Sequence, residues 1–239
     1  MTPNEGARAA AAGPAMLPRT QGLRAFRLRD LALLPALILL IVIGALVMHL
    51  IHLIAHLDSA RQGEVESFLA AARLLGDKLL CCCLQFAYLN RGKFASLNAF
   101  LDRLGPFLAA WPADVAVAVE VRNKTWMTPA LADCLRRHNA VCVLPDQVWM
   151  PSPLSLVQRA DLDVVTGPFA YIRLLGDRAA VDALPPTPDH IVIDRSPQVE
   201  MDARAIQVLR QRVPVVAFVN NHYAGYARET ARQLAALTG

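Results

Sequence analysis

The chain has 239 residues, of which 55% are hydrophobic and 18% charged, so it can bury the core of one large domain or of two small ones. Much of its net charge of +4 comes from arginines near the N-terminus, and no run of Lys and Arg is interleaved with aromatic residues. This pattern excludes a basic nucleic-acid face, and no nucleic-acid partner is expected. Five cysteines, three of them consecutive at Cys81, Cys82 and Cys83, match neither a disulfide framework nor a paired metal motif. In an extended strand, Cys82 would point to one face and its two neighbours to the other.

The first part of the chain has the composition of a leader followed by a membrane anchor. Residues 1–30 are basic and rich in Ala, Gly and Pro, and we expect them to be disordered. Residues 31–57 carry no formal charge and exceed the roughly 20 residues that a helix needs to cross a bilayer, which predicts a transmembrane helix. Arginines before this segment and acidic residues after it favour a cytoplasmic N-terminus. The protein is therefore expected to be membrane-associated if the segment is inserted, and cytoplasmic otherwise.

Residues 58–239 alternate between apolar runs and helical patterns, after an amphipathic helix that ends near Leu75. Strands are predicted at 79–86, 115–121, 140–144, 169–174 and 213–219, and helices at 94–110, 129–138, 201–211 and 225–237. Strands separated by helix-length segments are typical of parallel βα units, and near-continuous apolar strands indicate a sheet covered on both faces. The pattern predicts an α/β domain over residues 58–239.

Polar side chains follow each of the five predicted strands. Ligands of parallel α/β proteins bind outside the carboxyl ends of the strands, so these side chains are candidates for one common site. The candidate catalytic groups, as general acid, general base or proton shuttle, are Glu120, Asp146 and His222. The candidate ligand-binding groups, as donors to an anion or as orienting amides, are Arg122, Asn123, Tyr171, Arg173, Asn220 and Asn221.

Several of these residues have a purely structural alternative. Glu120 and Arg122 share a strand face and can simply pair with each other. Asp146 follows a proline and can be a turn residue. Glu120, Asp146 and His222 offer oxygen and nitrogen ligands for a metal, but their directions are unknown and no metal site is predicted.

The favoured function is the binding of a small polar or anionic ligand, with acid–base chemistry of a hydrolase or lyase type. The sequence contains no nucleophile elbow, HExxH motif, P-loop or Rossmann glycine pattern, so it identifies neither a substrate nor a cofactor. The alternatives are a membrane-tethered binding or structural protein without catalysis, and a truncated or frameshifted fragment of a larger barrel.

Five stretches of the chain form a recognisable set: AARLLGDKL, AVEVRNKTWMTPAL, DQVWMPSP, FAYIRLLGDR and VVAFVNNHYAGYA. Over about residues 68–237 the chain resembles the domain of unknown function 72 family, the YecE-like proteins. The residues that match the characteristic phrases of the family are Glu120, Arg122, Trp126, Tyr171, Arg173, Gly176, Asn220 and Asn221. The resemblance thereby adds Trp126 to the candidate ligand-binding residues.

That family is similar in fold to (β/α) barrels, which implies an incomplete TIM-like barrel with parallel strands, preceded by the hydrophobic helix. A barrel needs about eight strands to close, whereas five are predicted here. Nothing in the chain resembles the Gly-Thr-Ser-Gly-Trp-like first strand of the family. Either the hydrophobic segment and the helix after it replace the missing half, or two chains complete each other by self-association, or the reading frame is truncated or shifted.

Overall fold

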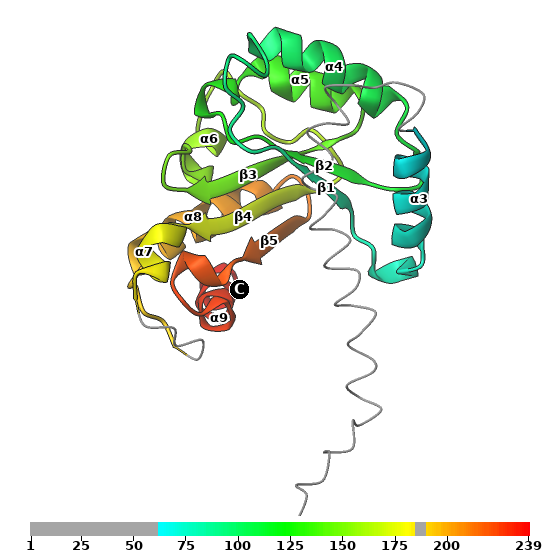
Figure 1. Cartoon of the computed structure of the whole chain (residues 1–239). Coiled ribbons are helices and arrows are strands. Elements are labelled where there is room, and N and C mark those ends of the chain that lie inside the picture. The colour runs from blue at the N-terminus through cyan, green and yellow to red at the C-terminus, as the bar shows by residue number, and fades with distance from the viewer. Residues whose placement is uncertain (1–61, 185–189) are drawn as a thin grey trace, which may run out of the picture. The chain divides into compact units, whose positions relative to one another are not determined.

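The computed structural model describes residues 62–184 and 190–239, whose five strands form one parallel sheet (Figure 1). The strands are β1 (Cys82–Gln85), β2 (Val117–Glu120), β3 (Val141–Gln147), β4 (Ala170–Gly176) and β5 (Val215–Val219). The order in the sheet is β1-β2-β3-β4-β5, so strands that are consecutive in the chain pair with each other. All five carboxyl ends therefore lie along the same edge of the sheet.

Helices precede, connect and follow the strands. They are α3 (Gln62–Arg73), α4 (Leu97–Ala109), α5 (Pro129–Arg137), α6 (Pro153–Val157), α7 (Arg178–Asp182), α8 (Ser196–Arg210) and α9 (Ala227–Thr238), with short 3₁₀ turns η1 (Gly76–Lys78), η2 (Lys124–Trp126) and η3 (Asn221–Tyr223). Local signals set their starts: Ser96 Oγ accepts a hydrogen bond from Ala99 N, at 3.2 Å, at the start of α4. Pro129 occupies the first turn of α5, where its missing N–H costs no hydrogen bond.

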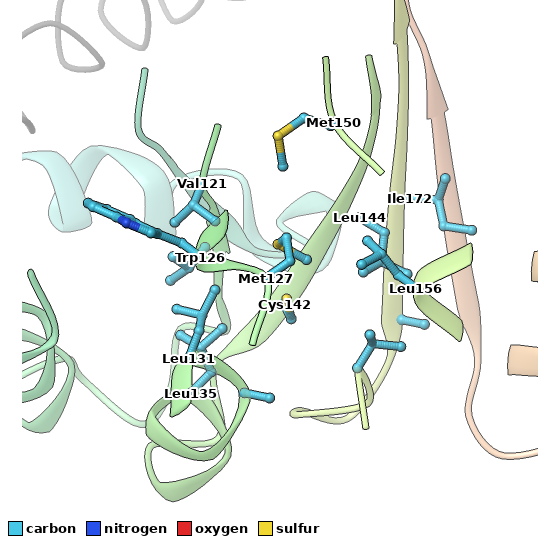
Figure 2. Close-up of a cluster of buried hydrophobic side chains, with 14 of the residues drawn as sticks. Val121, Trp126, Met127, Leu131, Leu135, Cys142, Leu144, Met150, Leu156 and Ile172 are labelled. Atoms are coloured by element: carbon cyan, nitrogen blue, oxygen red, sulfur yellow. The ribbon is translucent and has the colours of Figure 1, made fainter. Parts of the chain in front are cut away.

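The main core lies between one face of the sheet and the helices. Alternate strand residues enter it, as the period of two in a β-strand requires, and they pack against apolar side chains of α4, α5, α6, α8 and α9. Figure 2 shows part of this core, in which Leu144 of β3 and Ile172 of β4 lie beside Leu156 of α6. The opposite face carries a smaller buried cluster built around Ala118, Val143 and other strand residues, to which no helix of the described residues contributes.

The predicted α/β class and all five parallel strands are confirmed, with shifts of a few residues at the strand ends. The short helices α6 and α7 were not predicted, because five residues are too few for a helical period to show in the sequence. Within the described residues, β1 and β5 remain the two edges of the sheet, so the part of the chain that the structure describes does not close into a barrel.

The predicted basic leader (1–30) and the predicted transmembrane helix (31–57) lie outside the described residues. In the segments 62–184 and 190–239, no helix has both the length and the apolar character that crossing a bilayer requires. The prediction of a membrane anchor therefore has no support from the described part of the chain.

The three consecutive cysteines alternate between faces, as predicted. Cys82 packs with Leu69 and Ala72 of α3, whereas Cys81 and Cys83 adjoin the cluster on the opposite face. Burial raises the pKa of the Cys81 and Cys82 thiols to about 11 and that of the Cys83 thiol to about 12. All three thiols are therefore protonated at neutral pH, as inert packing groups would be.

Candidate ligand-binding site

Glu120, the last residue of β2, binds two arginines at the carboxyl edge of the sheet. Its side chain is 0% exposed, and its Oε1 accepts a hydrogen bond from Arg122 Nε at 2.8 Å. Its Oε2 accepts from Arg173 Nη1 of β4. The predicted pairing of Glu120 with Arg122 is thus present, and a second cation shares the same carboxylate.

The register of the sheet explains why Arg173 reaches Glu120. Val119 of β2 is level with Cys142 of β3, which places Glu120 level with Val143, and Val143 pairs with Tyr171 of β4. Arg173 lies two residues beyond Tyr171, on the same face and one step closer to the carboxyl edge. Its side chain can therefore turn back across β3 to the carboxylate on β2.

Arg173 makes further contacts around this ion pair. Its Nη1 also donates to Gln85 Oε1 of β1, at 2.7 Å, and its guanidinium lies over the Phe218 ring of β5, 5.9 Å from the ring centre. Its Nε is buried and has no hydrogen-bond partner within the described residues. Burial opposes the charge of Arg173, but the attraction of Glu120, aided by Cys83 and Tyr171, raises the pKa of the guanidinium above its usual value.

Tyr171 lies two residues before Arg173 in β4, and its side chain is on the same face of the sheet. Burial, with a smaller effect from Cys83, raises the pKa of its phenol to about 12, so the hydroxyl is neutral at physiological pH. Two guanidinium groups therefore face one carboxylate with neutral groups around them, and the cluster has a net positive charge.

Asn123 and Trp126 serve the structure of the loop after β2. Asn123 accepts from Leu89 N at 2.9 Å and donates to Leu89 O at 2.8 Å, so its amide joins the loops that follow β1 and β2. Trp126 is buried and stacks on Phe100 of α4, with 5.0 Å between ring centres. Both residues are candidate ligand-binding residues from the sequence, and the structure places both side chains in internal contacts.

The Asn-Asn-His segment after β5 is also used locally. Asn220 Oδ1 accepts from His222 N at 2.9 Å and lies 2.9 Å from His222 Nδ1, while Asn221 Oδ1 accepts from Ala227 N at the start of α9. His222 Nε2 lies 3.2 Å from an oxygen of Asp182. Both carboxamides therefore accept hydrogen bonds from backbone N–H groups, Asn220 as the cap of η3 and Asn221 at the start of α9.

Asp146 lies on the other face of the sheet. It is level with Leu174, a residue of the main core, and its neighbours are Asp202 of α8, Tyr223 of η3 and Arg195. The structure thus brings Glu120, Arg122, Arg173 and Tyr171 together, and it separates Asp146 from them. No group of three or more His, Cys, Asp or Glu side chains in the described residues is arranged to hold a metal ion.

The cluster around Asp146 contains residues that the sequence did not indicate. Tyr223 donates its hydroxyl hydrogen to Asp202 Oδ2 at 3.0 Å, and the Arg195 guanidinium lies 5.4 Å from the centre of the Tyr223 ring. Burial, and then the neighbouring Asp146 carboxyl, raise the pKa of Asp202 to about 8, and burial also raises the pKa of Asp146. One signal was available: Asp202 falls at helical spacing with the buried residues Val199, Ile206 and Leu209 of α8.

A cavity of about 300 Å³ lies beside Arg122, at the carboxyl edge of the sheet. It is lined by Tyr88 after β1, by Arg122 and Lys124 after β2, and by Trp149 after β3. A second cavity, of about 580 Å³, lies at the amino ends of β2 and β3 and includes Asp114 and Asn139 in its lining. The first cavity lies at the edge where parallel α/β proteins bind ligands.

The sequence matches a known protein family over most of its length. The model of the family described as "Protein of unknown function DUF72" matches residues 46–239. The chain belongs to the DUF72 family. The predicted resemblance over residues 68–237 is confirmed, and the match extends to both sides of it.

Solved DUF72 structures share the fold at low sequence identity. A DUF72 protein from Thermotoga maritima is 19% identical with a TM-score of 0.54, and the alignment covers 74% of this chain and 65% of that chain. A DUF72 protein from Enterococcus faecalis is 18% identical with a TM-score of 0.52, and the alignment covers 75% and 66%. The chain thus spans about two thirds of the length of these relatives. No curated protein matches the chain.

Proposed function

We propose that this DUF72 domain binds a small anionic ligand at the carboxyl edge of its sheet, with Arg122 and Arg173 as the cationic anchors. The observation that carries the proposal is the fully buried Glu120, which pairs with both arginines at once. One carboxylate neutralises only one of two guanidinium groups, and burial of an excess charge is costly unless a counter-ion compensates it.

Glu120 has an orienting role in this proposal. It accepts hydrogen bonds from Nε of Arg122 and from Nη1 of Arg173. These two bonds fix the orientation of each guanidinium plane and therefore the directions of its remaining N–H donors. The buried, unpaired Nε of Arg173 is one such donor. Fixed guanidinium groups bind carboxylate or phosphate oxygens with charge-assisted hydrogen bonds and lose little conformational entropy on binding.

The test is an anion titration of the full-length protein by calorimetry, with inorganic phosphate, sulfate and acetate as probes. Arg122→Ala and Arg173→Lys should each weaken the best-bound anion about tenfold or more, since a charge-assisted hydrogen bond contributes about 1.5–3 kcal/mol. Arg103→Ala, on the exposed surface of α4, is the matched control and should leave the affinity unchanged. Equal binding by all four proteins would refute the proposal.

A second candidate function is acid–base catalysis, which the shared environment of Asp146 and Asp202 favours. The two carboxyl groups are buried and interact with each other, and the pKa of Asp202 is raised to about 8. In such a pair one acid stays protonated at neutral pH. His222, which is paired with Asp182, offers a further proton-transfer group at the same edge. In this candidate function the domain is a hydrolase or lyase whose acidic groups lie on the face of the sheet opposite to the arginine cluster, so its substrate binds apart from Arg122 and Arg173.

Catalysis is tested by screening phosphate esters and lactones for turnover. Asp146→Asn and His222→Gln should abolish any turnover found, while anion affinity at the arginine cluster stays unchanged because these groups do not contact Glu120, Arg122 or Arg173. Turnover that survives both substitutions would exclude the acid–base role.

A further inference from the structure

The residues that line the 300 Å³ cavity come from three loops, all at the carboxyl edge of the sheet. Two of the four are aromatic and strongly exposed: Tyr88 is 68% and Trp149 is 52% exposed. The other two, Arg122 and Lys124, are cations. Large exposed aromatic side chains at the mouth of a cavity are typical of a recognition surface.

Both aromatic residues are held by buried neighbours, so their exposure is not that of a loose loop. Leu89, next to Tyr88, is buried, and the Asn123 amide holds both its N–H and its C=O. Met150, next to Trp149, is buried in the main core (Figure 2), and its N–H donates to Gln147 O at 2.8 Å. The backbone next to both aromatic residues is therefore anchored before any ligand arrives.

The cations at this cavity keep N–H donors that no carboxylate of the described residues uses. Arg122 uses its Nε on Glu120, and no acidic side chain within residues 62–184 and 190–239 pairs with its terminal nitrogens. Lys124, exposed at the start of η2, forms no ion pair with any described residue. The lining contains no carboxylate, so its charge is entirely positive.

We infer that this cavity binds a ligand with a flat, unsaturated ring that lies against Trp149 and Tyr88, and with an anionic group that binds Arg122 and Lys124. The inference deepens the proposed function and rests on it, because Arg122 belongs to both the cavity and the arginine cluster. A volume near 300 Å³ lies at the small end of the range for ligand pockets, which suits one ring system with one phosphate or carboxylate. A saturated ring would lose the stacking, and a neutral ring would leave the cations unpaired.

The experiment measures dissociation constants of the full-length protein by nuclear magnetic resonance titration. The probes are phenyl phosphate, cyclohexyl phosphate, inorganic phosphate and benzoate. Phenyl phosphate should bind about tenfold more tightly than cyclohexyl phosphate or inorganic phosphate, which is the order expected for one stacked ring. Comparable binding of benzoate would assign the anionic group as a carboxylate, and preference for phenyl phosphate would assign it as a phosphate ester.

Matched variants locate the effect. Trp149→Ala should remove the preference for the aromatic probe, whereas Leu74→Ala, another exposed apolar side chain on a distant helix end, should not. Lys124→Gln should weaken every anionic probe, whereas Lys78→Gln, an exposed lysine in η1, should weaken none.

The outcomes separate this inference from the proposed function. If inorganic phosphate binds in an arginine-dependent manner but the aromatic probe has no advantage, the inference is wrong and the anion site stands. If the advantage is present but survives both Trp149→Ala and Tyr88→Ala, the ring binds elsewhere and the inference is again wrong. If no anion binds at all, both are wrong.

Discussion

The charge balance of the site depends on Glu120, because it is the only carboxylate that pairs with Arg122 and Arg173 among the described residues. Glu120→Gln keeps the shape of the side chain but leaves two guanidinium groups without a counter-ion. Removing one partner of a buried ion pair costs about 3–5 kcal/mol, and the partial exposure of the arginines places the expected loss near the lower value. Urea denaturation measures it, with Glu200→Gln on the exposed side of α8 as the control. A loss no larger than that of the control would show that the cluster contributes little to stability.

Asp202 gives a residue-scale prediction about pH. Its pKa is raised from 3.8 to about 8 in the folded protein, so between these values the folded state binds more protons than the unfolded state. The free energy of unfolding must then fall as pH rises through this window, by at most about 1.4 kcal/mol per pH unit for one proton. Neighbouring Asp146 titrates with it, while Arg195 opposes protonation and Tyr223 donates a hydrogen bond.

Asp202→Asn is the variant that isolates this proton. The amide resembles the protonated carboxyl, so the variant should be the more stable protein at pH 8, and its advantage should shrink steadily towards pH 5. Thermal or urea unfolding at each pH measures the difference. Parallel stability curves for the two proteins between pH 5 and pH 8 would show that Asp202 titrates normally.

At the scale of elements, Gly176 controls how η3 packs on the end of β4. Its φ is +65°, and a Cβ at this position would lie 2.5 Å from Tyr223 Cα and 2.7 Å from His222 O. Gly76 is a matched control, because its φ is +52° but a Cβ there meets no atom within 4 Å. Gly76→Ala should cost about 1 kcal/mol from backbone strain alone, whereas Gly176→Ala should cost several kcal/mol because backbone atoms must also move. Equal losses in chemical denaturation would mean that η3 is free to shift.

The strands could be predicted because each is marked by an apolar run in the sequence. Which site residues contact one another depends instead on the register between strands. An apolar run that ends in polar residues identifies both β2 and its site residues. Because side chains alternate between the faces of a strand, Glu120 and Arg122, two residues apart, are predicted to share a face. The contact between Glu120 and Arg173 joins residues 53 positions apart, and it requires the registers of β2, β3 and β4 together. Asp146 shows the limit: it lies at the carboxyl end of its strand as Glu120 does, but on the other face of the sheet.

At the scale of the whole molecule, the open question raised by the sequence is whether two chains complete one another. In the described part of the chain, β1 and β5 are sheet edges, and Phe218 of β5 is about half exposed. Unpaired edge strands with exposed apolar side chains promote association between sheets. Self-association through the β5 edge is therefore the expected behaviour of the full chain.

Sedimentation velocity of the full-length protein in mild detergent measures this association. The protein should sediment as a dimer, and Phe218→Lys should shift it towards monomer, because a lysine at an edge strand opposes pairing with a second sheet. Leu74→Lys introduces the same charge at another exposed apolar position, at the end of α3, and controls for net charge and for association through other parts of the chain. A dimer that persists in the Phe218 variant would place the contact away from β5, and a monomeric parent protein would show that the sheet edges described here need no second chain.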